Sequence, residues 1–319
     1  TGAAQGVSSI TGPSGLRLDE AWLQHNFDGA RFSLLAGLYD SNSEFYRLRS
    51  AALFLNSSFG MGPELSQSGP AGPSVFPQTS LALRAQFKAT PEWLVRAAVA
   101  DARPARGDLA TPPPSGGAGA ALLGEVAFLN RPGDPEPRSR RVRTGRFAGL
   151  APYQDKYAVG FWHYTATFAD LSAQDAAGNP VLRHGSSGAY ALFDRLLTSA
   201  DSPHKTSAFV QLGAGDPRVN RFAAYVGAGA DISGVLPGRP DDELGFALAV
   251  ARNGGQYMDS QSLLGTPATR HETILEATYL VQVSKRAALQ PDLQYIVHPN
   301  TDPSVKNALV FMLRFEVSI

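Results

Sequence analysis

The histidines and carboxylates are the first residues to test for catalytic chemistry. Neighbouring carboxylates such as Asp19 and Glu20 resemble a glycosidase pair, but adjacent residues of a strand point to opposite faces. The chain has no nucleophile elbow, phosphate-binding loop or dinucleotide fingerprint. Metal-ligand spacing is absent among the six histidines, which are His25, His163, His184, His204, His271 and His298. We therefore expect no enzyme activity, no metal site and no cofactor.

Composition excludes further classes of protein. The 319 residues include no cysteine, which removes disulfides and thiolate chemistry, and the formal net charge of zero argues against a nucleic-acid partner. No apolar run reaches the roughly 18 residues that a transmembrane helix needs. The 32 glycines and 23 prolines favour many short strands joined by turns. The chain opens at TGAAQG without a charged-then-apolar leader, so we expect any signal peptide to have been removed.

The end of the chain gives the strongest signal for fold. In residues 306–319, the apolar side chains share one parity, whereas Arg314, Glu316 and Ser318 share the other. A period of two places the two sets on opposite faces of a strand. The apolar set consists of Leu309, Phe311, Leu313, Phe315, Val317 and Ile319. This alternation is typical of a transmembrane barrel strand, with lipid on one face and a wet lumen on the other.

The same alternation recurs along the chain and predicts about thirteen strands. Asp28-Gly29 is a hairpin signal between the first two strands, and Pro91-Glu92 makes another tight turn. By parity, Trp93 and Tyr295 face outward and are expected in an interfacial aromatic belt. The expected strands cover residues 16–27, 31–40, 80–88, 93–101, 120–130, 156–168, 187–198, 205–214, 220–232, 242–252, 271–284, 286–298 and 306–319.

Alternation fits a soluble β-sandwich as well as a barrel, because the charged face of a sandwich strand also meets water. The connections favour the barrel. Gly215-Asp216-Pro217 and Ser284-Lys285 make short turns, whereas residues 169–186, 253–270 and 298–305 form longer connections. Short turns at one end and longer loops at the other are expected of an outer-membrane barrel. The fold class is therefore all-β, a transmembrane antiparallel β-barrel of porin type.

Two long connections stand apart. Residues 41–76 contain the stretch EFYRLRSAALFLNSSFG, and such a long connection inside a β-protein is usually functional or disordered. Its apolar centre, which includes Leu53, Phe54 and Phe59, argues against disorder. The second connection, residues 131–155, is basic; it is a solvated loop or a contact to lipopolysaccharide phosphates. Its arginines are Arg138, Arg140, Arg141, Arg143 and Arg146.

Four stretches resemble the carbohydrate-selective porins, the OprB-like porins of Gram-negative outer membranes. They are QGVSSITGPSGLRLDEAWLQHNF (residues 5–27), EFYRLRSAALFLNSSFG (44–60), GVLPGRPDDELGFALAVAR (234–252) and LQPDLQYIVHPN (289–300). The resemblance covers nearly the whole chain, residues 1–319, as one barrel domain. It implies about sixteen strands in the full protein. We therefore expect roughly three further strands before residue 16, which this chain lacks. The family usually ends on an aromatic residue, where this chain has Ile319.

The resemblance also implies a constriction, formed by an inward loop that matches residues 41–76. A sugar-selective constriction needs polar groups for hydroxyls and an aromatic ring for stacking on the sugar. On this basis Arg84 and Arg96 carry fixed positive charge beside the loop, balanced across the lumen by Glu20 or Glu276. The expected lining residues are Glu20, Trp22 and Gln24 on the first strand, Glu44, Arg47, Arg49 and Asn56 in the loop, and Arg84, Lys88 and Arg96 on the next hairpin.

Each expectation has a structural alternative. Arg84 and Arg96 are alternatively solvated wall charges, and Trp22 alternatively packs against the loop. Arg47 and Arg49 alternatively pin the loop to carboxylates of the wall. The apolar part of the loop, AALFLNSSFG, is expected to be a structural anchor.

The expected function is passive, carbohydrate-selective diffusion of small sugars such as glucose through a water-filled outer-membrane channel. The expected partners are sugars, outer-membrane lipid and lipopolysaccharide, with a homo-oligomer left open. The alternatives are a general or other-solute porin on the same barrel and a soluble β-rich glycan-binding or glycan-cleaving protein.

Overall fold

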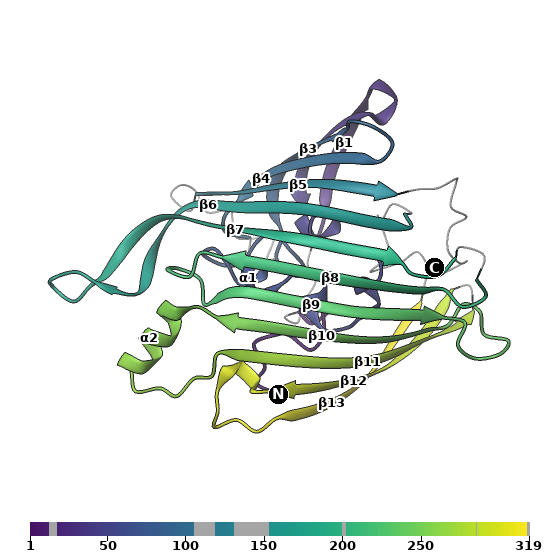
Figure 1. Cartoon of the computed structure of the whole chain (residues 1–319). Helices are drawn as coiled ribbons and strands as arrows, with labels where there is room; N and C mark the ends of the chain where they lie inside the picture. The colour runs from purple at the N-terminus through teal and green to yellow at the C-terminus, as the bar shows by residue number, and fades with distance from the viewer. Residues whose placement is uncertain (13–17, 105–118, 131–152, 200–201, 285, 318–319) are drawn as a thin grey trace.

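The computed structural model describes residues 1–12, 18–104, 119–130, 153–199, 202–284 and 286–317. Within these residues the chain forms one antiparallel sheet of 13 strands, each paired with its neighbour in sequence. The strands are β1 (Ala21–Phe27), β2 (Phe32–Tyr39), β3 (Ser80–Lys88), β4 (Trp93–Asp101), β5 (Ala120–Asn130), β6 (Asp155–Gln174), β7 (Pro180–Leu196), β8 (Thr206–Gly215), β9 (Phe222–Ser233), β10 (Glu243–Asn253), β11 (His271–Ser284), β12 (Ala287–Val297) and β13 (Ala308–Val317). Figure 1 shows the sheet curved around the segments that follow β2.

The helical elements are short and lie in the connections. They are α1 (Pro63–Ser66), α2 (Gly255–Leu263) and the 3-10 turns η1 (Asp28–Ala30), η2 (Ser41–Ser43), η3 (Ala51–Leu53), η4 (Ser57–Phe59) and η6 (Pro299–Thr301). In the described part of the chain, we find no helix with the length and apolar character needed to cross a membrane.

The all-β antiparallel fold and the strand count are confirmed, but the sheet is not closed. Among the described residues, β1 pairs only with β2, and β13 pairs only with β12. Neighbouring strands alternate in direction, so in a 13-stranded sheet β1 and β13 run the same way. An all-antiparallel barrel closes only with an even number of strands, which is why these two edges do not complete an antiparallel ladder.

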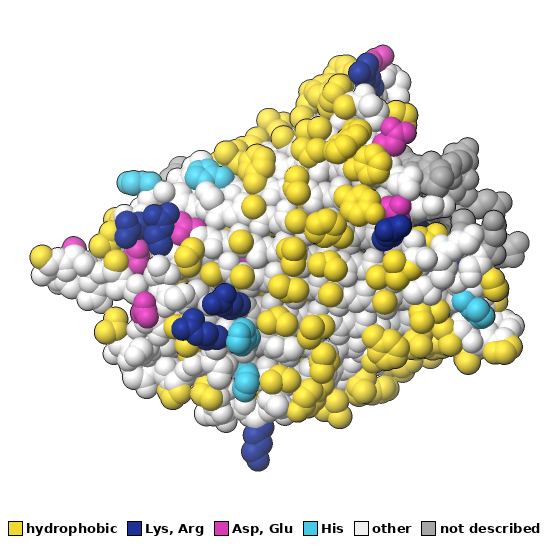
Figure 2. All heavy atoms as spheres, in the orientation of Figure 1, with side chains coloured by type: hydrophobic (Ala, Val, Ile, Leu, Met, Phe, Trp, Pro, Cys, Tyr) yellow, Lys and Arg dark blue, Asp and Glu magenta, His cyan; other side chains and the backbone are white. Residues whose placement is uncertain are grey.

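Register fixes which side chains face outward. Arg84 pairs with Leu35, and both are buried on the concave side, whereas the neighbouring Leu83 is 61% exposed. In β13 the exposed positions are the apolar ones, from Leu309 to Val317. Figure 2 shows the result as apolar side chains spread over the outer face, with many of the charged side chains gathered at one end. The predicted two-sided wall is therefore present.

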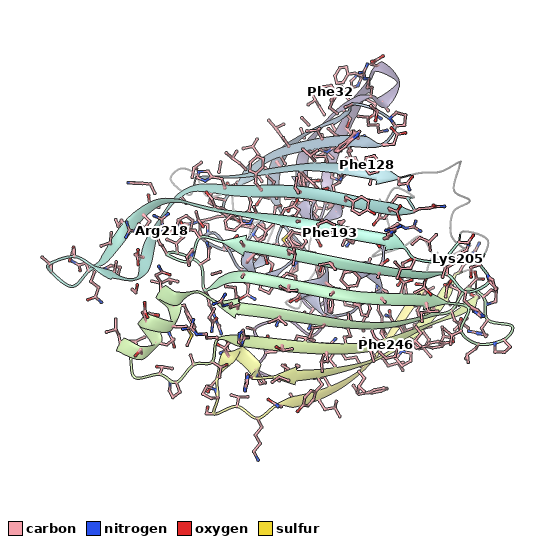
Figure 3. All side chains as sticks on the ribbon, viewed as in Figure 1. Phe32, Phe128, Phe193, Lys205, Arg218 and Phe246 are labelled. Carbon is pink, nitrogen blue, oxygen red and sulfur yellow. The ribbon has the colours of Figure 1, made fainter. Side chains whose placement is uncertain are left out.

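Aromatic side chains form a row on the outer face near one end of the sheet. Trp93 stacks edge-on against Phe128, and Phe128 is followed by Tyr157 and Phe193, with ring centroids 5.2–6.4 Å apart. Figure 3 shows Phe128, Phe193 and Phe246 toward the end that carries Lys205, with Arg218 at the opposite end. Trp93 and Tyr295 are 46% and 40% exposed on the outer face, as parity predicts. The row has the position of an interfacial aromatic girdle.

Two expectations about the connections are wrong. Residues 169–186 are not a long loop, because β6 and β7 extend through most of them and turn at residues 175–179. The extended hairpin projects beyond the rest of the sheet in Figure 1. The short turn after Gly215 lies at the same end as residues 254–270, since the strands alternate, so short and long connections are not strictly separated. The first strand begins at Ala21, and residues 13–17 lie outside the described residues.

Candidate functional site

Residues 41–76, here called the inward loop, lie against the concave face of the sheet. Most of their side chains are buried, including Phe45, Leu53 and Phe59 at 0–2% exposure. Phe54 packs on Phe209 of β8 with ring centroids 5.7 Å apart, and Tyr46 packs on Tyr190 of β7 at 4.4 Å. The apolar stretch therefore anchors the loop, as the structural interpretation of AALFLNSSFG predicts.

Carboxyl groups of the wall hold the backbone of the inward loop. Glu125 of β5 accepts a hydrogen bond from Tyr46 N at 3.0 Å. Asp194 of β7 accepts from Arg49 N at 2.9 Å and from Ser50 N at 3.1 Å. A buried amide that lost such an acceptor would cost roughly 1–3 kcal/mol, although Arg49 N also donates to the Tyr153 hydroxyl at 2.7 Å.

Glu276 of β11 continues this series at the far end of the loop. It accepts from Leu55 N at 2.5 Å and from Asn56 N at 3.0 Å. Gln290 of β12 donates to Leu53 O at 2.7 Å, and Gln294 accepts from Asn56 Nδ2 at 3.1 Å. Glu276 therefore positions loop backbone instead of balancing an arginine across the lumen.

Arg84 and Arg96 bind the start of the loop and are not solvated wall charges. The Arg84 guanidinium is 1% exposed and pairs with Glu44, with Nε and Oε2 2.7 Å apart. It also donates to Ser33 Oγ and to Gln24 Oε1, both at 2.7 Å. Arg96 donates to Glu44 O at 2.8 Å and to Gln86 Oε1 at 2.8 Å. Arg84 thus links β1, β2 and the inward loop through a single side chain.

A cavity of about 900 Å³ lies between the inward loop, the inner faces of β1 and β2, and Arg314 of β13. Trp22, on the inner face of β1, is 45% exposed and lines this cavity. The expected constriction residues that line it are Glu20, Trp22, Gln24, Glu44, Arg47, Asn56 and Arg84. The structure thus brings together, around one cavity, residues near β1, in β3 and in the inward loop that the sequence predicts to line the constriction.

Three expected residues lie outside this cavity. Lys88 is exposed at the end of β3 beside the turn to β4. Arg49 donates to Tyr153 O at 2.9 Å, and its guanidinium lies over the Tyr153 ring. Arg96 is held between Glu44 O and Gln86, as described above. The side chain of Arg49 therefore pins the loop, the structural alternative, although its partner is a carbonyl and a ring.

Sequence reasoning missed several residues of the cavity. Arg314 carries the inner parity of β13, and this signal was present in the alternation of the final strand. Phe76, the last residue of the inward loop, is 39% exposed and lines the cavity. Ser9 and Ile10 also line it, and they belong to a segment in which apolar and polar residues do not alternate. The basic cluster from Arg138 to Arg146 lies outside the described residues.

The charges of the cavity are close to balanced. Its arginines are Arg47, Arg84 and Arg314, and its carboxyl groups are Asp19, Glu20, Asp40 and Glu44. Burial, helped by the nearby Asp19 and Glu20, raises the pKa of Asp40 to about 7, against the opposing effects of the hydrogen bond from Asn42 N and the charge of Arg47. Burial also raises the pKa of Asp19 and lowers the pKa of Arg47. A partly protonated Asp40 leaves little net charge to select an ion.

The described residues contain no group of three or more histidines, aspartates or glutamates that could hold a metal ion. What the arrangement offers instead is a cavity of mixed lining, with charged and amide side chains and the exposed indole ring of Trp22. Carboxylates, amides and a guanidinium supply acceptors and donors for hydroxyl groups, and Trp22 supplies an apolar face.

Comparisons with known proteins identify the family of the chain and agree with its fold. A family model described as "Carbohydrate-selective porin, OprB family" matches residues 1–319. The chain is 25% identical over 329 residues to Porin B of Pseudomonas aeruginosa, which covers 94% of this chain and 67% of that protein. The high-pH structure of Pseudomonas putida OprB matches with a TM-score of 0.81 at 20% identity, covering 99% of this chain and 76% of that one. The low-pH structure of the same protein matches with a TM-score of 0.52 at 16% identity, covering 94% of this chain and 67% of that one.

Proposed function

Because the chain belongs to the carbohydrate-selective porin, OprB family, we propose that small neutral sugars such as glucose cross it by passive diffusion through the cavity beside the inward loop. The family consists of porins and not of enzymes, and its members are outer-membrane β-barrels. The observation that supports this route most is the exposed Trp22 ring among compensated charges.

The passage suits a neutral solute that is rich in hydroxyl groups. Arg84 is buried and paired with Glu44, so the partly exposed Glu44 carboxylate presents acceptors with little net field. Gln24, which is exposed, adds an amide, and Trp22 stacks on the C–H face of a sugar ring. Flux requires weak binding, because a tightly held sugar would block the channel.

The outer face supports a proposal for the surroundings of the chain. Apolar side chains cover it, with the aromatic row near one end, and such a surface is stable against lipid. We propose that this chain lies in the bacterial outer membrane, where its apolar outer face contacts lipid and lipopolysaccharide. Chemical crosslinking in native membranes distinguishes a homo-oligomer from a monomer in that setting.

Single-channel recording in planar bilayers tests the proposal. Glucose added to the bath should reduce the open-channel current in a saturable way, beyond its effect on bulk conductivity. Polyethylene glycol of similar size is the matched solute, and it should change the current only through bulk conductivity. Equal effects of the two solutes would leave a general porin, the alternative function, in place of a sugar-selective one.

A further inference from the structure

Residues 3–11, here called the strap, run along the concave side of the sheet beside the inward loop. Glu272 of β11 accepts from Ala4 N at 2.8 Å and from Gln5 N at 2.7 Å. Gln5 returns a hydrogen bond to Glu272 O at 3.1 Å, and both residues are at most 1% exposed. A wall carboxyl group therefore holds the strap in the same manner as the inward loop is held.

The strap is also bonded to the inward loop along its length. Ser57 N donates to Gly6 O at 2.8 Å, and Ser9 N donates to Leu55 O at 2.9 Å. Gln67 Nε2 donates to Ala4 O at 2.9 Å. From the wall side, Gln294 Nε2 donates to Val7 O at 2.9 Å. The strap is thus fixed between the wall and the loop at both of its faces.

Because the strap is held in this position, two of its residues line the cavity. Ser9 and Ile10 line it together with Trp22, and Ile10 is 55% exposed. An exposed aliphatic side chain in the lining of this cavity offers an apolar surface beside Trp22, and Ser9 offers a hydroxyl group. These are the two kinds of surface that a sugar ring presents in return.

We propose that the strap is a second selectivity element of the channel, in which Ser9 and Ile10 contact the passing sugar beside the residues contributed by the inward loop. This inference rests on the proposed sugar-selective function. Its alternative is that the strap only fills space behind the loop, in which case Ser9 and Ile10 would not meet solute. The two alternatives differ in whether a group attached at these positions enters the permeation path.

Cysteine substitution tests this directly, because the chain contains no cysteine. The variants are Ser9→Cys and Ile10→Cys, each treated with a small, water-soluble, charged methanethiosulfonate reagent during single-channel recording. Modification should lower the open-channel conductance by roughly a third or more and weaken the block by glucose. Glucose in the bath should slow modification at both positions. The matched control is Ala177→Cys, exposed in the turn between β6 and β7, where modification should leave both quantities unchanged.

The outcomes separate the strap from the wider proposal. If glucose does not block the wild-type channel, the proposed sugar-selective function is wrong, and the proposal for the strap is overturned as well. If glucose blocks the wild type, but Ser9→Cys and Ile10→Cys either resist the reagent or accept it without a change in conductance, the strap proposal alone is overturned. Two positions are used so that a folding defect in one variant leaves the other to decide.

Discussion

Arg84 and Glu44 form an ion pair that fixes the entry of the inward loop, with Nε and Oε2 2.7 Å apart. The guanidinium is 1% exposed, whereas the Glu44 side chain is 20% exposed and faces the cavity. The arginine also holds Gln24 Oε1 and Ser33 Oγ. One buried cation therefore orients a carboxylate and an amide of the passage, which makes it the point at which wall and constriction are coupled.

Arg84→Ala should make the channel more cation-selective and weaken glucose block. The substitution leaves the Glu44 carboxylate in the cavity without its partner, and it frees Gln24 from its fixed orientation. A lost hydrogen bond to a charged group corresponds to roughly a tenfold weaker sugar block. The reversal potential in a salt gradient and the concentration dependence of glucose block measure the two effects. Arg218→Ala removes an equal charge from an exposed pair outside the cavity and is the control. Unchanged values for both quantities would remove Arg84 from the selectivity site.

Trp22→Ala should weaken glucose block without changing ion selectivity, because the indole carries no charge. Loss of ring contacts corresponds to roughly a two- to tenfold weaker block. Trp22→Phe should retain part of it. Trp93→Ala is a matched control, since Trp22 and Trp93 are 45% and 46% exposed on opposite faces of the sheet. If glucose blocks Trp22→Ala as strongly as it blocks the wild type, Trp22 does not contact the sugar and serves only in packing.

The strands were predictable because alternation is a property of the chain itself. The bounds of β3, β4, β5 and β11 coincide with the expected ones, since each strand has an apolar outer face and begins or ends at a turn signal. The extension of the β6–β7 hairpin was missed because residues 169–186 carry little of this pattern. Where a strand extends beyond the part of the sheet that contacts lipid, its outward side chains meet water. Apolar and polar residues then no longer need to alternate.

The site was only half predictable for a related reason. Arg84 and Trp22 could be predicted because their positions in the strands place them on the inner face. The wall carboxyl groups Glu125, Asp194 and Glu276 instead accept from backbone amides, which have no sequence signature. Any loop residue supplies the same N–H group, so sequence cannot identify the partner of each carboxyl group. The strap was missed because its contacts are mostly of this kind, and because it has neither a period nor a turn signal that points inward.

Asp194→Ala should loosen the inward loop. Asp194 accepts four hydrogen bonds, two of them from the amides of Arg49 and Ser50, and one, at 2.7 Å, from Tyr153. Burial and the carboxylate together raise the pKa of Tyr153, which keeps its hydroxyl group a donor. The buried Ser50 amide loses its acceptor in this variant, at a cost of roughly 1–3 kcal/mol, whereas Arg49 N keeps the Tyr153 hydroxyl as an acceptor at 2.7 Å.

We expect a noisier open-channel current for Asp194→Ala and a lower temperature of heat-induced unfolding on gels. Asp194→Asn, which keeps one acceptor oxygen, should be intermediate. Asp175→Ala, at the exposed tip of the β6–β7 turn, is the control. Quiet openings with unaltered heat resistance in Asp194→Ala would show that the apolar packing alone holds the loop.

Glu64 should make the channel less stable at alkaline pH than at mildly acidic pH. It lies in α1 with 0% exposure and accepts a hydrogen bond from the Tyr46 hydroxyl at 2.9 Å. Burial raises its pKa from 4.5 to about 7, and the Tyr46 hydrogen bond opposes this only in part. Between these two values the folded protein binds more protons than the unfolded chain, so the free energy of unfolding falls as pH rises. The stabilisation is fully present below about pH 4.5 and is lost as pH passes through about 7, with an upper magnitude of about 3 kcal/mol.

Glu64→Gln isolates this contribution, because an amide has a similar shape and does not ionise. The wild type should unfold at a lower temperature at pH 8.5 than at pH 5.5, and Glu64→Gln should reduce that difference by raising the value at pH 8.5. Asp259→Asn removes an exposed carboxyl group on α2 and should leave the difference as it is. The same shift in the wild type and in Glu64→Gln would assign the pH dependence to another buried carboxyl group. Since α1 is part of the inward loop, open-channel noise recorded at the two pH values would then report whether the loop itself is the part that loosens.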